Sequence, residues 1–188
     1  MKSLIFALGV FACVPTFAAD TMLIDSGHSA LNFHWNHFGF SNPGARFELL
    51  EGTVKLDPKD LAKSSVDVTI PVDSLHTGLA VLDKRLKTPE FFDAEKYKVI
   101  TFKSTSVEKG PLDTFKVRGD LTVHGVSKSV VLEAKINKIQ SDATGKVSRA
   151  GFDAQTVLKR SDFGVGKYVP AVTDDILVRL SVELADEL

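Results

Sequence analysis

The chain has 188 residues, of which 44% are hydrophobic, with 23 basic and 24 acidic side chains, a formal net charge of −1 at pH 7 and one cysteine. This length suits one domain with a substantial core. Charges of both signs are interspersed without a long basic run. That pattern argues against a nucleic acid partner, because phosphate binding requires a concentrated basic surface.

Residues 1–18 have the pattern of an export signal. Lys2 supplies an early positive charge, an apolar run follows over 4–14, and Thr16-Phe17-Ala18 offers a small-residue cleavage site. The run is shorter than the roughly 20 residues that cross a bilayer. We therefore expect cleavage near Ala18, a periplasmic protein without a transmembrane segment, and a single domain over residues 19–188.

Cys13 lies inside this apolar run, and a lipid-attachment box around it is the alternative to an ordinary cleaved signal, although the bulky Phe11 disfavours it. After cleavage the chain has no thiol. This excludes disulfides, a cysteine nucleophile and cysteine-based zinc or iron–sulfur sites. The remaining 22 basic and 24 acidic residues give a formal net charge of −2.

From residue 31 onward, apolar and polar side chains alternate in short segments, which is typical of strands with one buried face. The first segment places Leu31, Phe33 and Trp35 on one face. Further strands are predicted over 47–56, 66–70, 100–103, 115–123, 129–136, 150–157 and 176–184. Eight strands joined by short turns, without a strand–helix–strand rhythm, predict an all-β, antiparallel sheet that can close into a barrel.

One segment, residues 75–97, departs from this alternation. Leu79, Leu82 and Leu86 recur at helical spacing, and Pro89-Glu90-Phe91-Phe92-Asp93 is typical of a second short helix or a turn. We expect a short helical insertion between two strands of the barrel. No internal repeat or linker indicates a second domain.

An eight-stranded barrel is wide enough either to be filled by side chains or to hold one small ligand. Ten phenylalanines remain after residue 18, beside one tryptophan and two tyrosines. This composition favours a smooth apolar interior that could receive a ligand. A plain packed core, serving a non-catalytic structural, stress-related or interaction module, is the alternative.

The sequence offers no recognisable catalytic motif. Ser106-Val107-Glu108-Lys109 has Ser-x-x-Lys spacing but follows a strand, where the two side chains point to opposite faces. On a strand His34 and His37 also face opposite ways, and His28 lies roughly 20 Å from His34. We predict neither an enzyme nor a metal or cofactor site. The remaining alternative, a metal-dependent periplasmic enzyme, requires His28, His34 or His124 to meet another ligand within about 5 Å in the fold.

Lys159 and Arg160 form a charged pair directly before Ser161-Asp162-Phe163-Gly164. Cations beside an aromatic residue at the end of a strand could bracket an anionic head group. A solvated loop is the alternative interpretation.

Several motifs follow one another in order after residue 18: Ile24-Asp25-Ser26-Gly27-His28-Ser29, His37-Phe38-Gly39-Phe40-Ser41, Pro89-Glu90-Phe91-Phe92-Asp93, Gly119-Asp120-Leu121-Thr122-Val123-His124-Gly125-Val126 and Arg160-Ser161-Asp162-Phe163-Gly164. Together they resemble the YceI-like family. The resemblance implies a lipocalin-like eight-stranded barrel, often a dimer, with an elongated apolar tunnel that holds a polyisoprenoid or fatty-acyl-like lipid.

The chain departs from the family at one motif. Where many relatives carry Arg-Asp-x-His-Leu, this chain has Leu82-Asp83-Lys84-Arg85-Leu86. A head-group role of the family's histidine is therefore in doubt here. Arg85 could replace it with a permanent cation.

The mechanism that we expect is sequestration of a long-chain lipid, in which each buried CH₂ contributes about 0.8 kcal/mol. The predicted tunnel-lining residues are Phe33, Trp35, Phe38, Phe91, Phe92, Phe102 and Phe163. Polar groups at one mouth would orient the head group. The candidates are Arg85, Lys159, Arg160 and His28.

Overall fold

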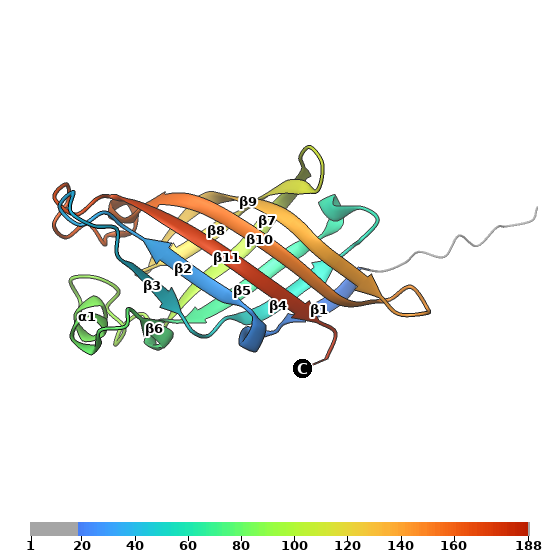
Figure 1. The fold of residues 1–188 in the computed structure, drawn as a ribbon, viewed down its shortest axis with the longest axis horizontal. Helices are drawn as coiled ribbons and strands as arrows, with labels where there is room; N and C mark the ends of the chain where they lie inside the picture. Colours follow the sequence, from blue (N-terminus) through green and yellow to red (C-terminus); the bar gives the residue numbers. More distant parts are fainter. Residues whose placement is uncertain (1–18, 188) are drawn as a thin grey trace, which may run out of the picture.

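The computed structural model describes residues 19–187, which form a barrel of antiparallel strands with one α-helix at one end (Figure 1). The predicted export signal, residues 1–18, lies outside the described residues. The strands are β1 (Asp20–Ile24), β2 (Ala30–His34), β3 (Gly44–Phe47), β4 (Glu51–Leu56), β5 (Ser65–Pro71), β6 (Leu75–His76), β7 (Val99–Lys109), β8 (Thr114–Val123), β9 (Val126–Ser141), β10 (Val147–Lys159) and β11 (Asp175–Ala185).

The helical elements are short. The α-helix is α1 (Ala80–Leu86), and the 3₁₀ turns are η1 (Ser26–His28), η2 (Leu61–Lys63), η3 (Val72–Ser74) and η4 (Arg160–Phe163). Within residues 19–187, no helix has the length and apolar character needed to span a membrane.

Eight strands close the barrel, as the sequence predicted. The hydrogen-bonded ring runs β1, β4, β5, β7, β8, β9, β10, β11 and returns to β1. Strand β2 pairs with a different part of β11, so β1 and β2 follow one another along the same neighbour, interrupted by η1. The side branch β2, β3, β6 thereby extends the wall at the end where α1 lies.

At the end of the barrel where α1 lies, β6 and the helical insertion form part of the wall. Strand β6 pairs with β3 and is followed by the helical insertion, whereas β7 pairs with β5. Leu82 and Leu86 of α1 and Phe91 and Phe92 of the following turns face the barrel interior. The insertion predicted over 75–97 therefore serves as part of the wall, although its helix is limited to seven residues and 89–93 is a turn.

Some strand boundaries differ from the predicted ones for local reasons. Residues 48–50 separate β3 from β4 inside the predicted 47–56 strand, and β1 was missed because its five residues contain one short alternation. Strands β7 and β9 extend beyond their predicted ends through mostly polar residues, in which Val107 and Ile139 are the inward-facing exceptions on the C-terminal side. The predicted turn at His124-Gly125 is a two-residue hairpin with φ of 51° and 74°, the conformation that favours glycine.

The interior is apolar, and no polar or charged side chain among residues 19–187 is buried. One cluster fills the barrel on the β1 side of the ring, around Met22, Leu56 and Leu184. A second cluster consists of Phe102, Val107, Phe115, Val117 and Ala134. These clusters leave the end next to α1 for a cavity.

Candidate functional site

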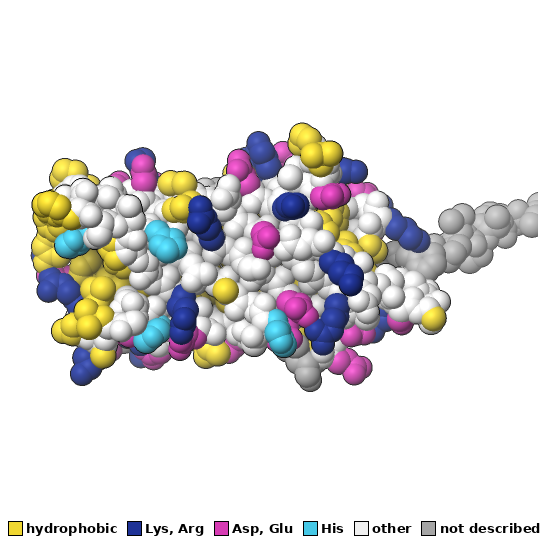
Figure 2. Space-filling model, in the orientation of Figure 1, with side chains coloured by type: hydrophobic (Ala, Val, Ile, Leu, Met, Phe, Trp, Pro, Cys, Tyr) yellow, Lys and Arg dark blue, Asp and Glu magenta, His cyan; other side chains and the backbone are white. Residues whose placement is uncertain are grey.

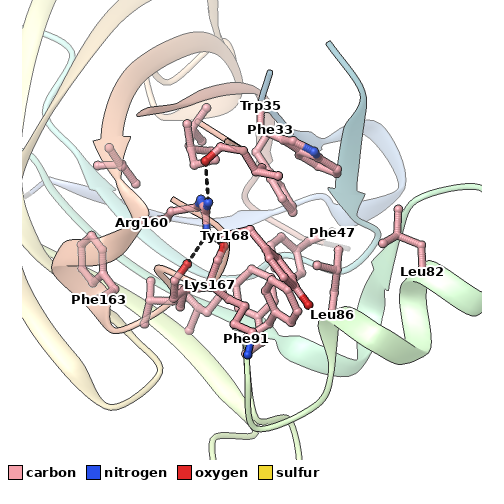
Figure 3. Close-up of a pocket in the computed structure, with 18 of the residues that line it drawn as sticks. Phe33, Trp35, Phe47, Leu82, Leu86, Phe91, Arg160, Phe163, Lys167 and Tyr168 are labelled. Carbon is pink, nitrogen blue, oxygen red and sulfur yellow. Dashed lines mark hydrogen bonds between the residues drawn. The ribbon is translucent and has the colours of Figure 1, made fainter. Parts of the chain in front are cut away.

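A cavity of about 500 Å³ opens at the end of the barrel where α1 lies (Figure 3). Nineteen of its 24 lining residues are apolar. The inner lining residues Leu31, Phe47 and Ile100 are buried, whereas Phe38 and Tyr168 at the opposite end are exposed to solvent. The cavity is therefore an apolar pocket whose solvent-exposed lining residues lie at the end of the barrel next to α1.

Aromatic rings from two distant segments form one side of this pocket. Strand alternation points Phe33 of β2 and Phe47 of β3 inward, where their rings stack with centroids 5.6 Å apart. Phe92 of the insertion meets both rings edge-on, at 6.2 Å and 5.8 Å, and Trp35 lies 5.9 Å from Phe33. Such offset and edge-on geometry is the favourable arrangement of aromatic pairs.

The opposite side of the pocket is built from η4 and the insertion. Phe163 and Val165 pack with Phe91 in a small buried cluster. The pocket also receives Leu158, Val123 and Leu121 from the neighbouring strands. Seven aromatic residues were predicted to line a tunnel, and six of them line this pocket. These six are Phe33, Trp35, Phe38, Phe91, Phe92 and Phe163.

Phe102 is placed elsewhere, and its predicted place on the wall is corrected. It points inward from β7 like Ile100, but two residues farther from the mouth, where it packs in the second cluster with Phe115 and Val117. Its ring covers Gly119, where an added Cβ would lie 2.5 Å from the ring carbon Cζ. Phe102 thus fills the barrel beyond the inner end of the cavity.

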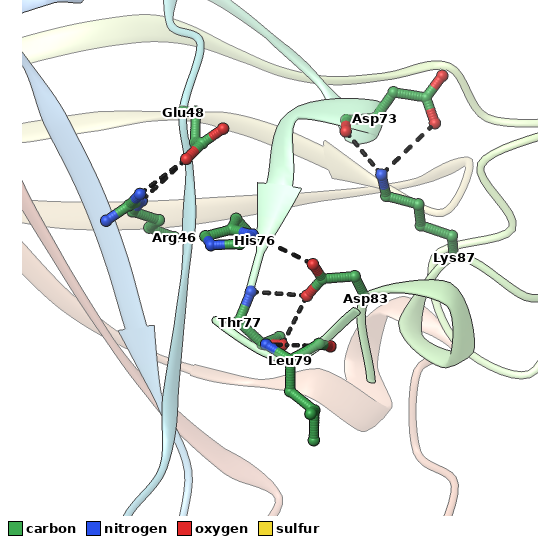
Figure 4. Close-up of polar contacts among 8 residues, drawn as sticks. All are labelled: Arg46, Glu48, Asp73, His76, Thr77, Leu79, Asp83 and Lys87. Carbon is green, nitrogen blue, oxygen red and sulfur yellow. Dashed lines mark hydrogen bonds and ion pairs between the residues drawn. The ribbon is translucent and has the colours of Figure 1, made fainter. Parts of the chain in front are cut away.

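Salt bridges hold α1 and its neighbours against the barrel (Figure 4). The Asp83 carboxylate accepts hydrogen bonds from the Thr77 amide at 2.7 Å and the Thr77 hydroxyl, and pairs with His76 at 3.1 Å. These contacts lower the pKa of Asp83, and the hydrogen bond from the Thr77 hydroxyl has the largest effect. Lys87 donates to the Asp73 carbonyl at 2.6 Å. The position of the wall residues Leu82 and Leu86 is fixed by this network.

Polar groups gather at the mouth. Arg85 of α1 donates to the Tyr168 hydroxyl and lies 3.7 Å from the Glu90 carboxylate, which Lys167 pairs with at 2.9 Å. The Lys167 hydrogen bond lowers the pKa of Glu90, and the Glu90 bond raises the pKa of Lys167. Arg85 and Lys167 also each lie 5.5 Å from the Tyr168 ring centroid, within cation–π range. Arg85 thus stands where the sequence predicted a head-group cation.

Arg160 lines the same cavity, but its guanidinium is engaged by backbone. It donates to four carbonyl oxygens, those of Val165, Lys167, Val172 and Thr173, at 2.6–2.8 Å. Four of its five N–H donors are therefore used. Burial lowers the pKa of Arg160. Its main visible role is to hold the loop between η4 and β11 that carries Tyr168.

Lys159 and His28, the other predicted head-group residues, do not reach the cavity. Leu158 points inward, so the next residue of the strand points outward, where Lys159 pairs with Asp175 at 2.9 Å. His28 lies in η1, at the opposite end of β2 from the mouth. Both predicted placements at the mouth are corrected by the strand geometry.

His28 instead belongs to a charged group on the surface. Its Nδ1 lies 2.8 Å from the Asp25 carboxylate, and Glu183, which also pairs with Arg149, is close by. One ligand atom each of Asp25, His28 and Glu183 lie within 4.8 Å of one another, so His28 meets the distance of about 5 Å that the metal-site alternative requires. His34 and His124 do not join them, because His34 packs on Gly44 and His124 packs edge-on against Tyr97.

The contact between His28 and Asp25 gives a first testable prediction. The hydrogen bond to Asp25, followed by the charges of Asp25 and Glu183, raises the pKa of His28 above its ordinary value of 6.5. An NMR titration should therefore place the His28 midpoint above 6.5, and Asp25→Asn should lower it. Glu108→Gln, which removes a carboxylate at the other side of the molecule, should leave it unchanged. If Asp25→Asn left the His28 midpoint unchanged, Asp25 would not be the cause of the raised pKa of His28.

The sequence did not single out several residues of the pocket. Phe47 carried a usable signal, because it opens a predicted strand with the inward alternation of Phe33. Lys167 and Tyr168 carried none, since a loop without periodicity does not tell where its side chains point. Leu82 and Leu86 were recognised as helical but not as part of a binding wall.

The model of the YceI-like domain family matches residues 23–184. The chain belongs to the YceI-like family. Protein YceI of Escherichia coli is 36% identical over 184 residues, which cover 97% of this chain and 95% of that protein. This match extends along the whole barrel, so the family relationship includes both the pocket and the packed clusters.

Solved structures of YceI-like proteins have the same fold. The YceI protein of Campylobacter jejuni is 33% identical, with a TM-score of 0.70 over 79% of this chain and 87% of that one. A polyisoprenoid binding domain from Saccharophagus degradans, implicated in plant cell wall breakdown, has a TM-score of 0.68 over 89% of this chain and 98% of that one. It is 16% identical, so this likeness concerns the fold.

Proposed function

We propose that this protein is a non-catalytic periplasmic carrier that binds one long-chain apolar lipid, a polyisoprenoid or a fatty-acyl-like chain, with the chain in the barrel cavity. The observation that carries the proposal is the pocket of about 500 Å³ with nineteen apolar lining residues. A pocket of this size and lining favours a carrier over a packed interaction module. The polyisoprenoid binding domain from Saccharophagus degradans supports the isoprenoid class.

The energetics suit an apolar chain. Each buried CH₂ contributes about 0.8 kcal/mol, so about ten buried carbons provide about 8 kcal/mol against several kcal/mol of association cost. The polar mouth, with Arg85, Lys167 and Tyr168, suits a polar or anionic end that remains near water. Export to the periplasm is part of the proposal, because the export signal predicted over residues 1–18 is what supports it.

The cavity volume sets the length of chain that fits. A water molecule occupies about 30 Å³ of liquid, so about 500 Å³ accommodates roughly 15–20 non-hydrogen atoms. This corresponds to roughly three or four isoprene units. Phe102 and its cluster fill the barrel beyond that point. A longer chain would have to leave its excess at the mouth.

Fluorescence of Trp35 tests both the binding and the length limit. Trp35 is the single tryptophan of the sequence and lies on the cavity wall, so its emission reports on the cavity alone. In titrations with geraniol, farnesol, geranylgeraniol and a longer polyprenol, we expect affinity to rise up to farnesol or geranylgeraniol and then level off. An unchanged spectrum with every prenol would contradict the carrier function, and a continued rise would contradict the length limit.

Native mass spectrometry of the protein purified from its own periplasm, followed by lipid extraction, would identify the natural cargo. A stoichiometric isoprenoid or acyl lipid is expected. Recovery from the periplasmic fraction tests the proposed localisation at the same time. The homodimer implied by the family resemblance stays a prediction, which light scattering of the same sample measures.

A further inference from the structure

Exposed apolar side chains surround the mouth of the cavity. They come in pairs from three segments that are far apart in the sequence: Phe38 and Phe40 between β2 and β3, Leu79 and Val81 at the start of α1, and Tyr168 and Val169 between η4 and β11. We call these six residues the rim. Figure 2 shows hydrophobic side chains gathered at the end of the molecule where these segments lie.

The three segments are joined to one another. His37 forms a bridge with Val172, and the Phe38 amide donates to the Ala171 carbonyl at 3.0 Å, which connects the first segment to the third. Arg85 of α1 donates to Tyr168, which connects the second to the third. The rim is therefore one continuous, braced surface.

Two aromatic residues of the rim, which also line the mouth of the cavity, have a backbone conformation that is energetically costly. Phe38 and Tyr168 have φ of 53° and 67°, a region that residues other than glycine rarely adopt. The Gly39 amide donates to the Asn36 side chain at 2.7 Å and the Phe40 amide to the His37 carbonyl at 3.0 Å, so the exposed turn is hydrogen-bonded. Strained residues persist only where surrounding contacts enforce them, which is common at binding surfaces.

The charges around the rim suit an anionic, apolar layer. Residues 35–43 contain no Asp, Glu, Lys or Arg, so bringing this loop out of water desolvates no ionised carboxylate or ammonium group. Beside the rim lie the exposed cations Lys84, Arg85 and Lys167. The carboxylates next to them are already paired, Glu90 with Arg85 and Lys167 and Asp83 with His76. A surface with apolar residues flanked by Lys and Arg is typical of proteins that insert into the boundary of anionic bilayers.

We infer that the open end of the barrel docks on a lipid bilayer through the rim. The inference rests on the proposed function for its purpose, because a cavity mouth pressed into the bilayer lets an apolar chain move between membrane and pocket without crossing water. This route avoids exposing the apolar chain to water, which is unfavourable in proportion to its apolar surface. A second copy of the chain seated on the rim would cover the mouth instead, which does not suit a pocket that must fill and empty.

Flotation with vesicles of equimolar phosphatidylethanolamine and phosphatidylglycerol tests the docking. The test variant is Phe40→Glu combined with Val81→Glu, at side chains that are 91% and 68% exposed and do not line the cavity. The matched control is Leu112→Glu, because Leu112 is also 91% exposed but lies in the turn between β7 and β8. All three positions are solvent-exposed, so far-UV circular dichroism should be unchanged.

We expect the natural protein and Leu112→Glu to float with the vesicles and the double variant to lose binding at least about tenfold. Farnesol titration of Trp35 in detergent-free buffer should be equal in all three proteins, which separates docking from cargo binding. Equal vesicle binding by the double variant would overturn the inference. The inference would also be overturned if the natural protein stayed in the aqueous phase as a dimer and the double variant were a monomer. The rim would then be a contact between two copies of the chain.

Discussion

Phe92→Glu is expected to lower the affinity for farnesol at least about a hundredfold. Phe92 stands edge-on to Phe33 and Phe47 inside the pocket, and these rings offer a carboxylate no hydrogen-bond donor. Binding an apolar chain there would require burying an unpaired charge or a newly protonated acid, at a cost of several kcal/mol. A loss of about 2.7 kcal/mol is already a hundredfold. The measurement is the Trp35 fluorescence titration.

Two controls make this result specific. Phe92→Leu keeps the wall apolar and should weaken binding by about tenfold or less, because it removes ring contacts without introducing a charge. Leu112→Glu adds the same carboxylate on the outside and should not change the affinity. If Phe92→Glu bound farnesol as tightly as the natural protein while remaining folded, the chain would not lie in this cavity.

Arg160→Met is expected to destabilise the protein by about 3 kcal/mol. The substitution removes four hydrogen bonds from a charged donor to carbonyls of the loop between η4 and β11. Hydrogen bonds to charged groups contribute about 1.5–3 kcal/mol each where buried, and partial access of water to these carbonyls reduces the total. Urea unfolding followed by circular dichroism measures the change. Methionine retains the apolar stem, so the loss reports on the hydrogen bonds.

The neighbouring residue provides the control. Lys159→Met removes the neighbouring cation, but Lys159 makes a solvent-exposed ion pair with Asp175, so this variant should keep nearly the stability of the natural protein. A stable Arg160→Met variant with greatly weakened binding of an anionic lipid such as farnesyl phosphate would contradict the structural role and favour the head-group role predicted from the sequence. A destabilised Arg160→Met variant that still binds farnesyl phosphate would support the structural role and contradict the head-group role.

The barrel could be predicted from the sequence because strand alternation is a local signal. Leu31, Phe33 and Trp35 face inward, and their spacing alone indicates it. Alternation says which face of the sheet a residue occupies but not how far along the barrel it lies. This is why Phe33 and Phe102 looked equivalent, although one lines the cavity and the other closes the space behind it.

The mouth was harder to predict because its contacts join distant segments. Arg85 and Tyr168 are 83 positions apart, and their hydrogen bond depends on how the insertion and the last loop fold back over the barrel end. The sequence indicates Arg160 as a candidate head-group residue, but its pattern of a cation beside an aromatic residue does not distinguish a ligand-binding guanidinium from one that binds its own loop. Counting its carbonyl partners requires the folded chain.

For the proposed carrier, the buried cluster around Phe102 has a consequence for the order of events during lipid exchange. Phe102 and its neighbours pack behind the pocket, so a chain in the pocket meets packed side chains at its inner end. A bound molecule that entered tail first must back out through the same opening before another can take its place. Exchange is then first-order in the loaded protein, so raising the concentration of a competing lipid cannot hasten the departure of the one already inside.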